Sequence, residues 1–161
     1  MTNFSLSEKS VRHLLEDVRD WGGRGRETGG FLLRGVDSDL ADILALAGRT
    51  GVRRRRHHFR ISALAIGRLF DWAVEHDLSV AAVVHSHRHD AFLSGSDLQG
   101  GFSVPGFVTA VIPRYQDPPA EHRRWGWWKY GEGEWRDLTA PPLYRAPVTI
   151  IGFDEDGVRE S

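Results

Sequence analysis

Two histidines separated by one serine, His85 and His87, follow an apolar run in the segment VVHSHRHDAFLSGSD. Because side chains alternate along an extended strand, the two imidazoles point to the same side, about 6–7 Å apart along the chain. Two imidazoles placed in this way can converge on one metal ion. A catalytic zinc ion needs a third protein ligand and an open position for water.

Asp97 is the natural candidate for the third ligand, because a helix beginning near Ser94 would turn its carboxylate back towards the strand end. Asp90 is the alternative, although it lies only three residues beyond His87 and would require a tight loop. The chain contains no cysteine. Nitrogen and oxygen ligands therefore have to suffice, and zinc accepts both.

Hydrolysis also requires a group that accepts a proton, and Glu27 can fill this role. It stands at the mouth of a predicted neighbouring strand, followed by Gly29 and Gly30. Zinc lowers the pKa of a coordinated water molecule to roughly 7, and a nearby carboxylate can take the proton and pass it to the leaving group. The pattern indicates metal-assisted hydrolysis.

The segment ETGGFLLRG, followed by H-S-H, six residues and S-x-x-D, resembles the JAMM (MPN+) metalloprotease family, especially its bacterial JAB-type members. The resemblance implies an α/β fold, a cytidine-deaminase-like three-layer α/β/α domain with a central mixed sheet, over residues 1–161 as a single domain. It also implies the site: one catalytic Zn²⁺ held by His85, His87 and Asp97, Glu27 as general base, and Ser94 as the hydroxyl that stabilises the oxyanion.

The spacer between the second histidine and the serine differs from the family pattern. The family usually has seven residues there, whereas this chain has six, 88–93. A one-residue deletion is easily accommodated in a loop, but it leaves Ser96 and Gly95 as alternatives to Ser94.

The same resemblance implies a function. It predicts a zinc-dependent isopeptidase or peptidase that hydrolyses the amide bond after the C-terminal glycine of ubiquitin or a bacterial ubiquitin-like protein. E1- and E2-like proteins of an antiphage defence or sulfur-carrier pathway are the further partners it suggests. The alternative is a non-catalytic MPN-type scaffold that binds such partners. A zinc deaminase would normally use cysteine ligands, which this chain lacks.

Hydrophobic periodicity predicts mixed helices and strands around these residues. The expected helices begin at a Ser5 capping box, with Val11, Leu14, Leu15, Val18 and Trp21 buried, and at Ser62, running to Asp77 with Ile66, Leu69, Phe70, Ala73 and Val74 buried. The expected strands are Glu27–Gly35, its antiparallel partner Leu40–Gly48, Arg53–Ser62, the central Leu78–Val84 and Phe107–Pro113, a hairpin of Trp125–Tyr130 with Glu134–Leu138, and a last strand Val148–Phe153.

Composition is typical of a soluble globular protein. The chain has 161 residues, 40% hydrophobic and 27% charged, with a net charge of −1. Neither the charge nor the longest apolar run suggests a nucleic-acid or membrane partner, and we expect a cytoplasmic location. The basic run RRRRHH (53–58) is interpreted as a solvated strand face or a protein-contact surface, with His57 and His58 structural. Salt-sensitive DNA binding there would indicate a DNA-repair association instead.

Overall fold

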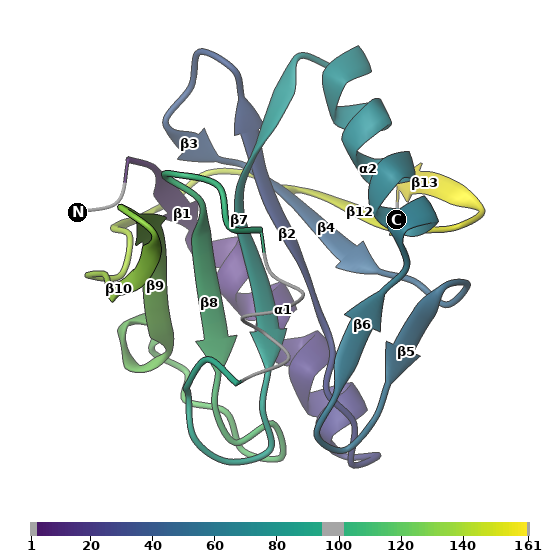
Figure 1. The fold of residues 1–161 in the computed structure, drawn as a ribbon, viewed down its shortest axis with the longest axis vertical. Helices are drawn as coiled ribbons and strands as arrows, with labels where there is room; N and C mark the ends of the chain where they lie inside the picture. Colours follow the sequence, from purple (N-terminus) through teal and green to yellow (C-terminus); the bar gives the residue numbers. More distant parts are fainter. Residues whose placement is uncertain (1–2, 95–101, 161) are drawn as a thin grey trace.

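The centre of the molecule is a mixed sheet, seen in the computed structural model, which describes residues 3–94 and 102–160 (Figure 1). Within the described residues this sheet has eight strands in the order β10-β9-β8-β7-β2-β4-β12-β13, with β7 parallel to β8 and β4 parallel to β12. The strands are β2 (Gly29–Gly35), β4 (Ile43–Ala47), β7 (Leu78–Ser86), β8 (Val108–Ile112), β9 (Gly126–Gly131), β10 (Glu134–Asp137), β12 (Thr149–Asp154) and β13 (Gly157–Glu160).

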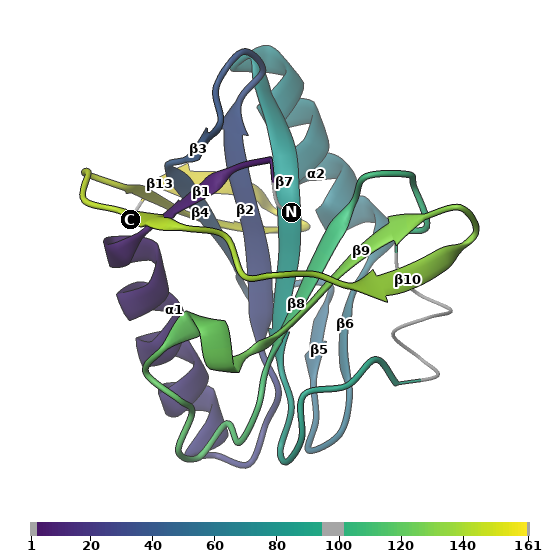
Figure 2. The ribbon, with the colours of Figure 1, turned by 90° about the vertical axis from the view of Figure 1, so that its left-hand side faces the viewer.

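One helix covers each face of this sheet (Figure 2). Helix α1 (Glu8–Gly22) packs with β2, β7 and β8 in one buried cluster, and α2 (Ala63–Glu75) packs in a second cluster that contains Phe31 and Phe153. The central strand β7 supplies side chains to both clusters, as its continuous apolar sequence predicts. The three-layer α/β/α arrangement with a mixed sheet is thus confirmed.

The helix caps follow the predicted chemistry with one shift. In α1 the capping side chain is Ser7, whose hydroxyl accepts a hydrogen bond from the Lys9 amide, and not Ser5, which lies in a short strand. Helix α2 begins at the predicted cap, Ser62, which accepts from Ala65. Val74 was expected to be buried, but its side chain is 75% exposed because it lies on the solvent side of α2.

The remaining strands are short. Strands β1 (Ser5–Ser7), β3 (Leu40–Ala41) and β11 (Leu143–Tyr144) form one small sheet, and β5 (Val52–Arg54) and β6 (Phe59–Ile61) form an antiparallel hairpin. A 3-10 turn covers His122–Arg124.

Two strand predictions are corrected. The single strand predicted over Arg53–Ser62 is a hairpin, because the chain turns where the Arg55 amide bonds to the His58 carbonyl. The predicted last strand is followed by β13, and the turn between them places Gly157 at φ 122°, a conformation that suits glycine. Neither helix of the described chain is long and apolar enough to cross a membrane.

Candidate active site

Strand pairing brings Glu27 to the paired histidines. Strands β2 and β7 are antiparallel, so the start of β2 lies beside the end of β7, with Gly29 opposite His85. A Cβ atom on Gly29 would collide with the Val84 carbonyl oxygen and the His85 backbone. The glycine in ETGG therefore permits the close strand approach that carries Glu27 to the end of β7.

The two imidazoles face each other as the alternation predicts. The Nε2 atoms of His85 and His87 are 3.1 Å apart, and the two residues are only 8% and 6% exposed. The Nδ1 of His87 lies 3.3 Å from the Asp90 carbonyl oxygen. Donation from Nδ1–H to that carbonyl leaves the lone pair of His87 on Nε2, the atom that faces His85.

Ser86, the residue between the histidines, fixes the two strands to each other. Its side-chain oxygen accepts a hydrogen bond from the Thr28 amide at 2.9 Å, and its amide donates to the Thr28 carbonyl at 2.9 Å. Both residues are fully buried. Since Thr28 is the neighbour of Glu27, this contact sets the position of the glutamate backbone relative to the histidine pair.

A cavity of about 120 Å³ opens at this strand end. Glu27, His85 and Ser94 all line it, so the structure brings these three predicted residues together. The ring of His87 contacts the ring of His85, which lines the cavity. The walls are completed by apolar side chains, namely Phe31, Phe59, Ile61, Ile66, Val83 and Phe102.

Behind Glu27 lies a buried polar network that the sequence did not reveal. The Arg54 guanidinium donates to the Thr28 hydroxyl at 3.0 Å and to the carbonyls of Ala47 and Gly48 at 2.6 Å each. The Thr28 hydroxyl in turn donates to Asp17 at 3.0 Å. Burial raises the pKa of the Asp17 carboxyl and lowers the pKa of Arg54, with their mutual attraction opposing both shifts.

The Arg54 side chain also stacks on an aromatic ring. Its guanidinium carbon lies 4.2 Å from the centre of the Trp21 ring, a cation–π distance. This arginine belongs to the RRRR run but is 8% exposed. A charge run gives no signal of which member turns inward, so sequence reasoning could not single it out.

Tyr115 is a second support that sequence reasoning missed. It is fully buried, its amide donates to the His87 carbonyl at 3.0 Å, and its hydroxyl donates to the Arg56 carbonyl at 3.3 Å. Burial raises the pKa of the Tyr115 phenol, and the charges of Arg88, Arg56 and Glu27 also act on it. Tyr115, in the loop after β8, is thereby bonded both to the backbone of His87 and to the turn between β5 and β6.

The histidines of the basic run lie closer to the site than their distance in the sequence suggested. His57 and His58 both line the cavity with Glu27. They reach it because the β5–β6 turn folds against the start of β2, where the Glu27 amide donates to the Arg55 carbonyl at 2.8 Å; their interpretation as structural residues stays a prediction. His89, in the loop after β7, is exposed.

The donor set fits zinc as far as the described chain extends. Zn–N bonds of about 2.0–2.1 Å in a tetrahedral site separate two ligand nitrogens by roughly 3.3 Å, close to the observed Nε2 separation of 3.1 Å. Within residues 3–94 and 102–160, no three His, Asp or Glu side chains form a metal-binding cluster. The predicted third ligand, Asp97, lies outside these ranges, as do the alternatives Gly95 and Ser96.

Comparisons with known proteins bear on the fold. No protein-family model and no curated protein matches the sequence. Solved structures do match, among them a JAB1/MPN domain protein, AF2198 from Archaeoglobus fulgidus, with a TM-score of 0.50 and 13% identity over 89% of this chain and 100% of that one.

Two further structures are similar over most of both chains. Protein DSY2949 from Desulfitobacterium hafniense gives a TM-score of 0.65 at 16% identity, covering 89% of this chain and 94% of its own. A protein from Salinibacter ruber gives 0.57 at 22% identity, covering 86% and 91%. The chain therefore adopts an MPN-like α/β fold.

Proposed function

We propose that this chain is a zinc-dependent peptidase or isopeptidase that hydrolyses the amide bond after the C-terminal glycine of ubiquitin or a bacterial ubiquitin-like protein. One observation carries the proposal. On an MPN-like fold, a buried glutamate, Glu27, lines the same cavity as His85, whose Nε2 is 3.1 Å from the Nε2 of His87.

In this proposal His85, His87 and Asp97 hold one zinc ion. When bound, zinc supplies Lewis acidity, which lowers the pKa of a coordinated water molecule and polarises the scissile carbonyl. The Asp90 carbonyl fixes the ring of His87, and Ser86 ties β7 to β2, so these backbone contacts orient the ligands.

Glu27 accepts the proton of the attacking water and delivers it to the departing amine. Glu27 is 5% exposed, and its backbone is fixed by its own bond to Arg55 and by the bond of the neighbouring Thr28 to Ser86. The Ser94 hydroxyl, on the cavity wall, donates to the developing oxyanion. No covalent intermediate with the protein is required.

The substrate tail enters as an extended chain beside β6. Within the described chain, β5 and β6 pair only with each other, and their register directs the backbone groups of Phe59 and Ile61 away from β5. The same two residues line the cavity. An added strand on this edge would lead a glycine terminus to Glu27.

The test is cleavage of a ubiquitin-like protein fused through Gly–Gly to a reporter. Zinc-loaded protein should release the reporter, a chelator should abolish release, and added zinc should restore it. A fusion with valine in place of the last glycine is the matched control and should resist. Tight binding without cleavage by zinc-loaded protein would contradict the proposal and favour the non-catalytic scaffold.

A further inference from the structure

The β5–β6 hairpin concentrates positive charge that the fold does not use. Residues 52–61 include five arginines and no acidic residue, in a chain whose net charge is −1. Arg54 turns inward to the network behind Glu27. The other four are exposed and define what we call the arginine face: Arg53, Arg55, Arg56 and Arg60.

The arginine face contains an unfavourable pairing. Arg53 lies directly opposite Arg60 in the antiparallel register, and like charges at such positions repel each other. Among the described residues, no ion pair involves any arginine of this face. Carboxylates of a binding partner would relieve the repulsion and form charge-assisted hydrogen bonds.

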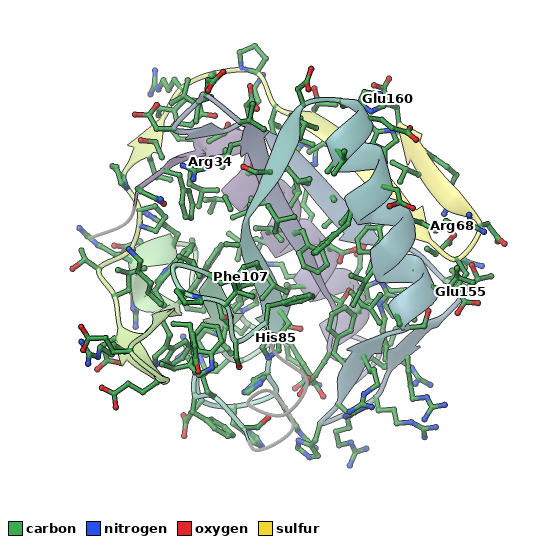
Figure 3. The ribbon with its side chains drawn as sticks, turned by 45° about the horizontal axis from the view of Figure 1, so that its top comes forward. Arg34, Arg68, His85, Phe107, Glu155 and Glu160 are labelled. Atoms are coloured by element: carbon green, nitrogen blue, oxygen red, sulfur yellow. The ribbon has the colours of Figure 1, made fainter. Side chains whose placement is uncertain are left out.

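The arginine face adjoins the candidate active site. Arg60 lines the cavity together with Glu27. The carbonyls of Arg55 and Arg56 accept hydrogen bonds from the Glu27 amide and the Tyr115 hydroxyl, at 2.8 Å and 3.3 Å. In Figure 3, nitrogen-tipped side chains project outward from this hairpin.

We propose that the arginine face binds an acidic segment of the substrate polypeptide, so that the proteins this chain processes carry Asp or Glu residues shortly before the terminal glycines. The inference rests on the proposed function, because it assigns the substrate class to the same cavity. Carboxylates lying over the hairpin would hold the extended tail on the β6 edge, whereas a basic tail would be repelled.

A polypeptide fits this surface better than a nucleic acid. Single-stranded nucleic acids bind where exposed aromatic rings accompany basic residues. Here Phe59 is only partly exposed and Phe31 is 1% exposed, and both line the cavity. The unpaired β6 edge, in contrast, offers the backbone hydrogen bonds that an extended peptide requires.

Binding of three labelled peptides tests the inference without requiring hydrolysis. The peptides end in a free Gly–Gly carboxylate and carry three glutamates, three glutamines or three arginines before it. Fluorescence anisotropy should show the glutamate peptide binding about tenfold tighter than the glutamine peptide, because each of three exposed ion pairs contributes a factor of about two. The preference should vanish at about 1 M salt, where the Debye length is about 3 Å.

Charge reversal gives the matched comparison. The double variant Arg53→Glu with Arg60→Glu brings the net charge of the arginine face to zero and should abolish the glutamate preference, and Arg55→Gln with Arg56→Gln should reduce that preference. Arg12→Glu, at an exposed position of α1, should leave it unchanged. Equal binding of the glutamate and glutamine peptides, or tighter binding of a single-stranded oligonucleotide, would overturn the inference.

Cleavage of the reporter fusion, measured separately, distinguishes the two proposals. Binding of the glutamate peptide without any cleavage would refute the hydrolase and leave the arginine face supported. Cleavage that is indifferent to acidic residues before the glycines would refute only the acidic-substrate inference.

Discussion

The Nε2 atoms of His85 and His87 lie 3.1 Å from each other at the end of β7. Each ring reaches this position from its own backbone anchor. Ser86, the residue after His85, is bonded to Thr28, which directly precedes β2, and the amide of His87 donates to the Ile112 carbonyl of β8 at 2.9 Å. The pair is therefore set by three adjacent strands and not by a flexible loop.

Zinc content should depend on this pair. We expect about one zinc ion per wild-type chain and a large loss of zinc in His85→Ala and His87→Ala, since removing one imidazole leaves too few ligands for tight binding. Elemental analysis of purified protein measures this. His13→Ala, at an exposed histidine of α1, should retain the full content, and wild-type protein without zinc after reconstitution would contradict the prediction.

The contact between β2 and β7 should be intolerant of added volume. Gly29→Ala places a methyl group against the backbone of Val84 and His85 and should destabilise the fold by about 2 kcal/mol or more, because the strands must separate. Denaturant unfolding gives the value. Gly67→Ala is the control, since a Cβ atom there meets nothing within 4 Å; in a helix it should be neutral or stabilising. Equal effects at both glycines would contradict the packing argument.

The Arg54 network should contribute to stability and to the position of Glu27. Arg54→Lys removes the fork that bonds Thr28, Ala47 and Gly48, and leaves buried groups unsatisfied, at an expected cost of about 2–4 kcal/mol. Thermal or denaturant unfolding checks this. The neighbouring exposed Arg53→Lys should change stability by less than about 0.5 kcal/mol. A negligible effect of Arg54→Lys would show that the network is dispensable.

Acid sensitivity should originate partly at Asp154. This carboxylate is 3% exposed and accepts hydrogen bonds from Arg159 and from the amides of Arg49 and Asp156, which hold its pKa well below the ordinary value of 3.8. Because the folded pKa is depressed, the stabilisation is complete above this ordinary value and is lost progressively as the pH falls from it towards the folded pKa.

The measurement is the free energy of unfolding between neutral pH and pH 2–3. Wild-type protein should lose stability steeply below about pH 4, whereas Asp154→Asn should be less stable at pH 7 and show a shallower decline. Asp156→Asn, at an exposed neighbour, should follow the wild-type curve. Parallel curves of unfolding free energy against pH for wild type and Asp154→Asn would show that the acid sensitivity does not originate at Asp154.

The sequence predicted those features that depend on local periodicity. Strand alternation placed His85 and His87 on one side, and the apolar run of β7 indicated a central strand. The sequence could not predict the order of the strands in the sheet. It therefore could not show that the turn after β5 reaches Glu27 and carries His57 to the cavity wall. These contacts join segments about 30 residues apart, and only the folded sheet brings them together.

Single side chains turned inward from polar runs were also beyond sequence reasoning. Arg54 and its exposed neighbour Arg53 have the same chemistry, and only the hairpin register separates them. Ser86 looked like a spacer between two histidines, yet it is the residue that bonds β7 to Thr28. Such roles arise from long-range pairing, which a linear pattern does not contain.

The most direct measurement compares Glu27→Gln with wild type on the Gly–Gly reporter fusion, with zinc content determined on the same samples. The amide keeps the size of the carboxylate but cannot accept the proton. We expect Glu27 to be the general base, so that zinc content is unchanged and the cleavage rate is lower by a factor of about 10²–10⁴. Zinc-loaded Glu27→Gln that cleaves at the wild-type rate would contradict it.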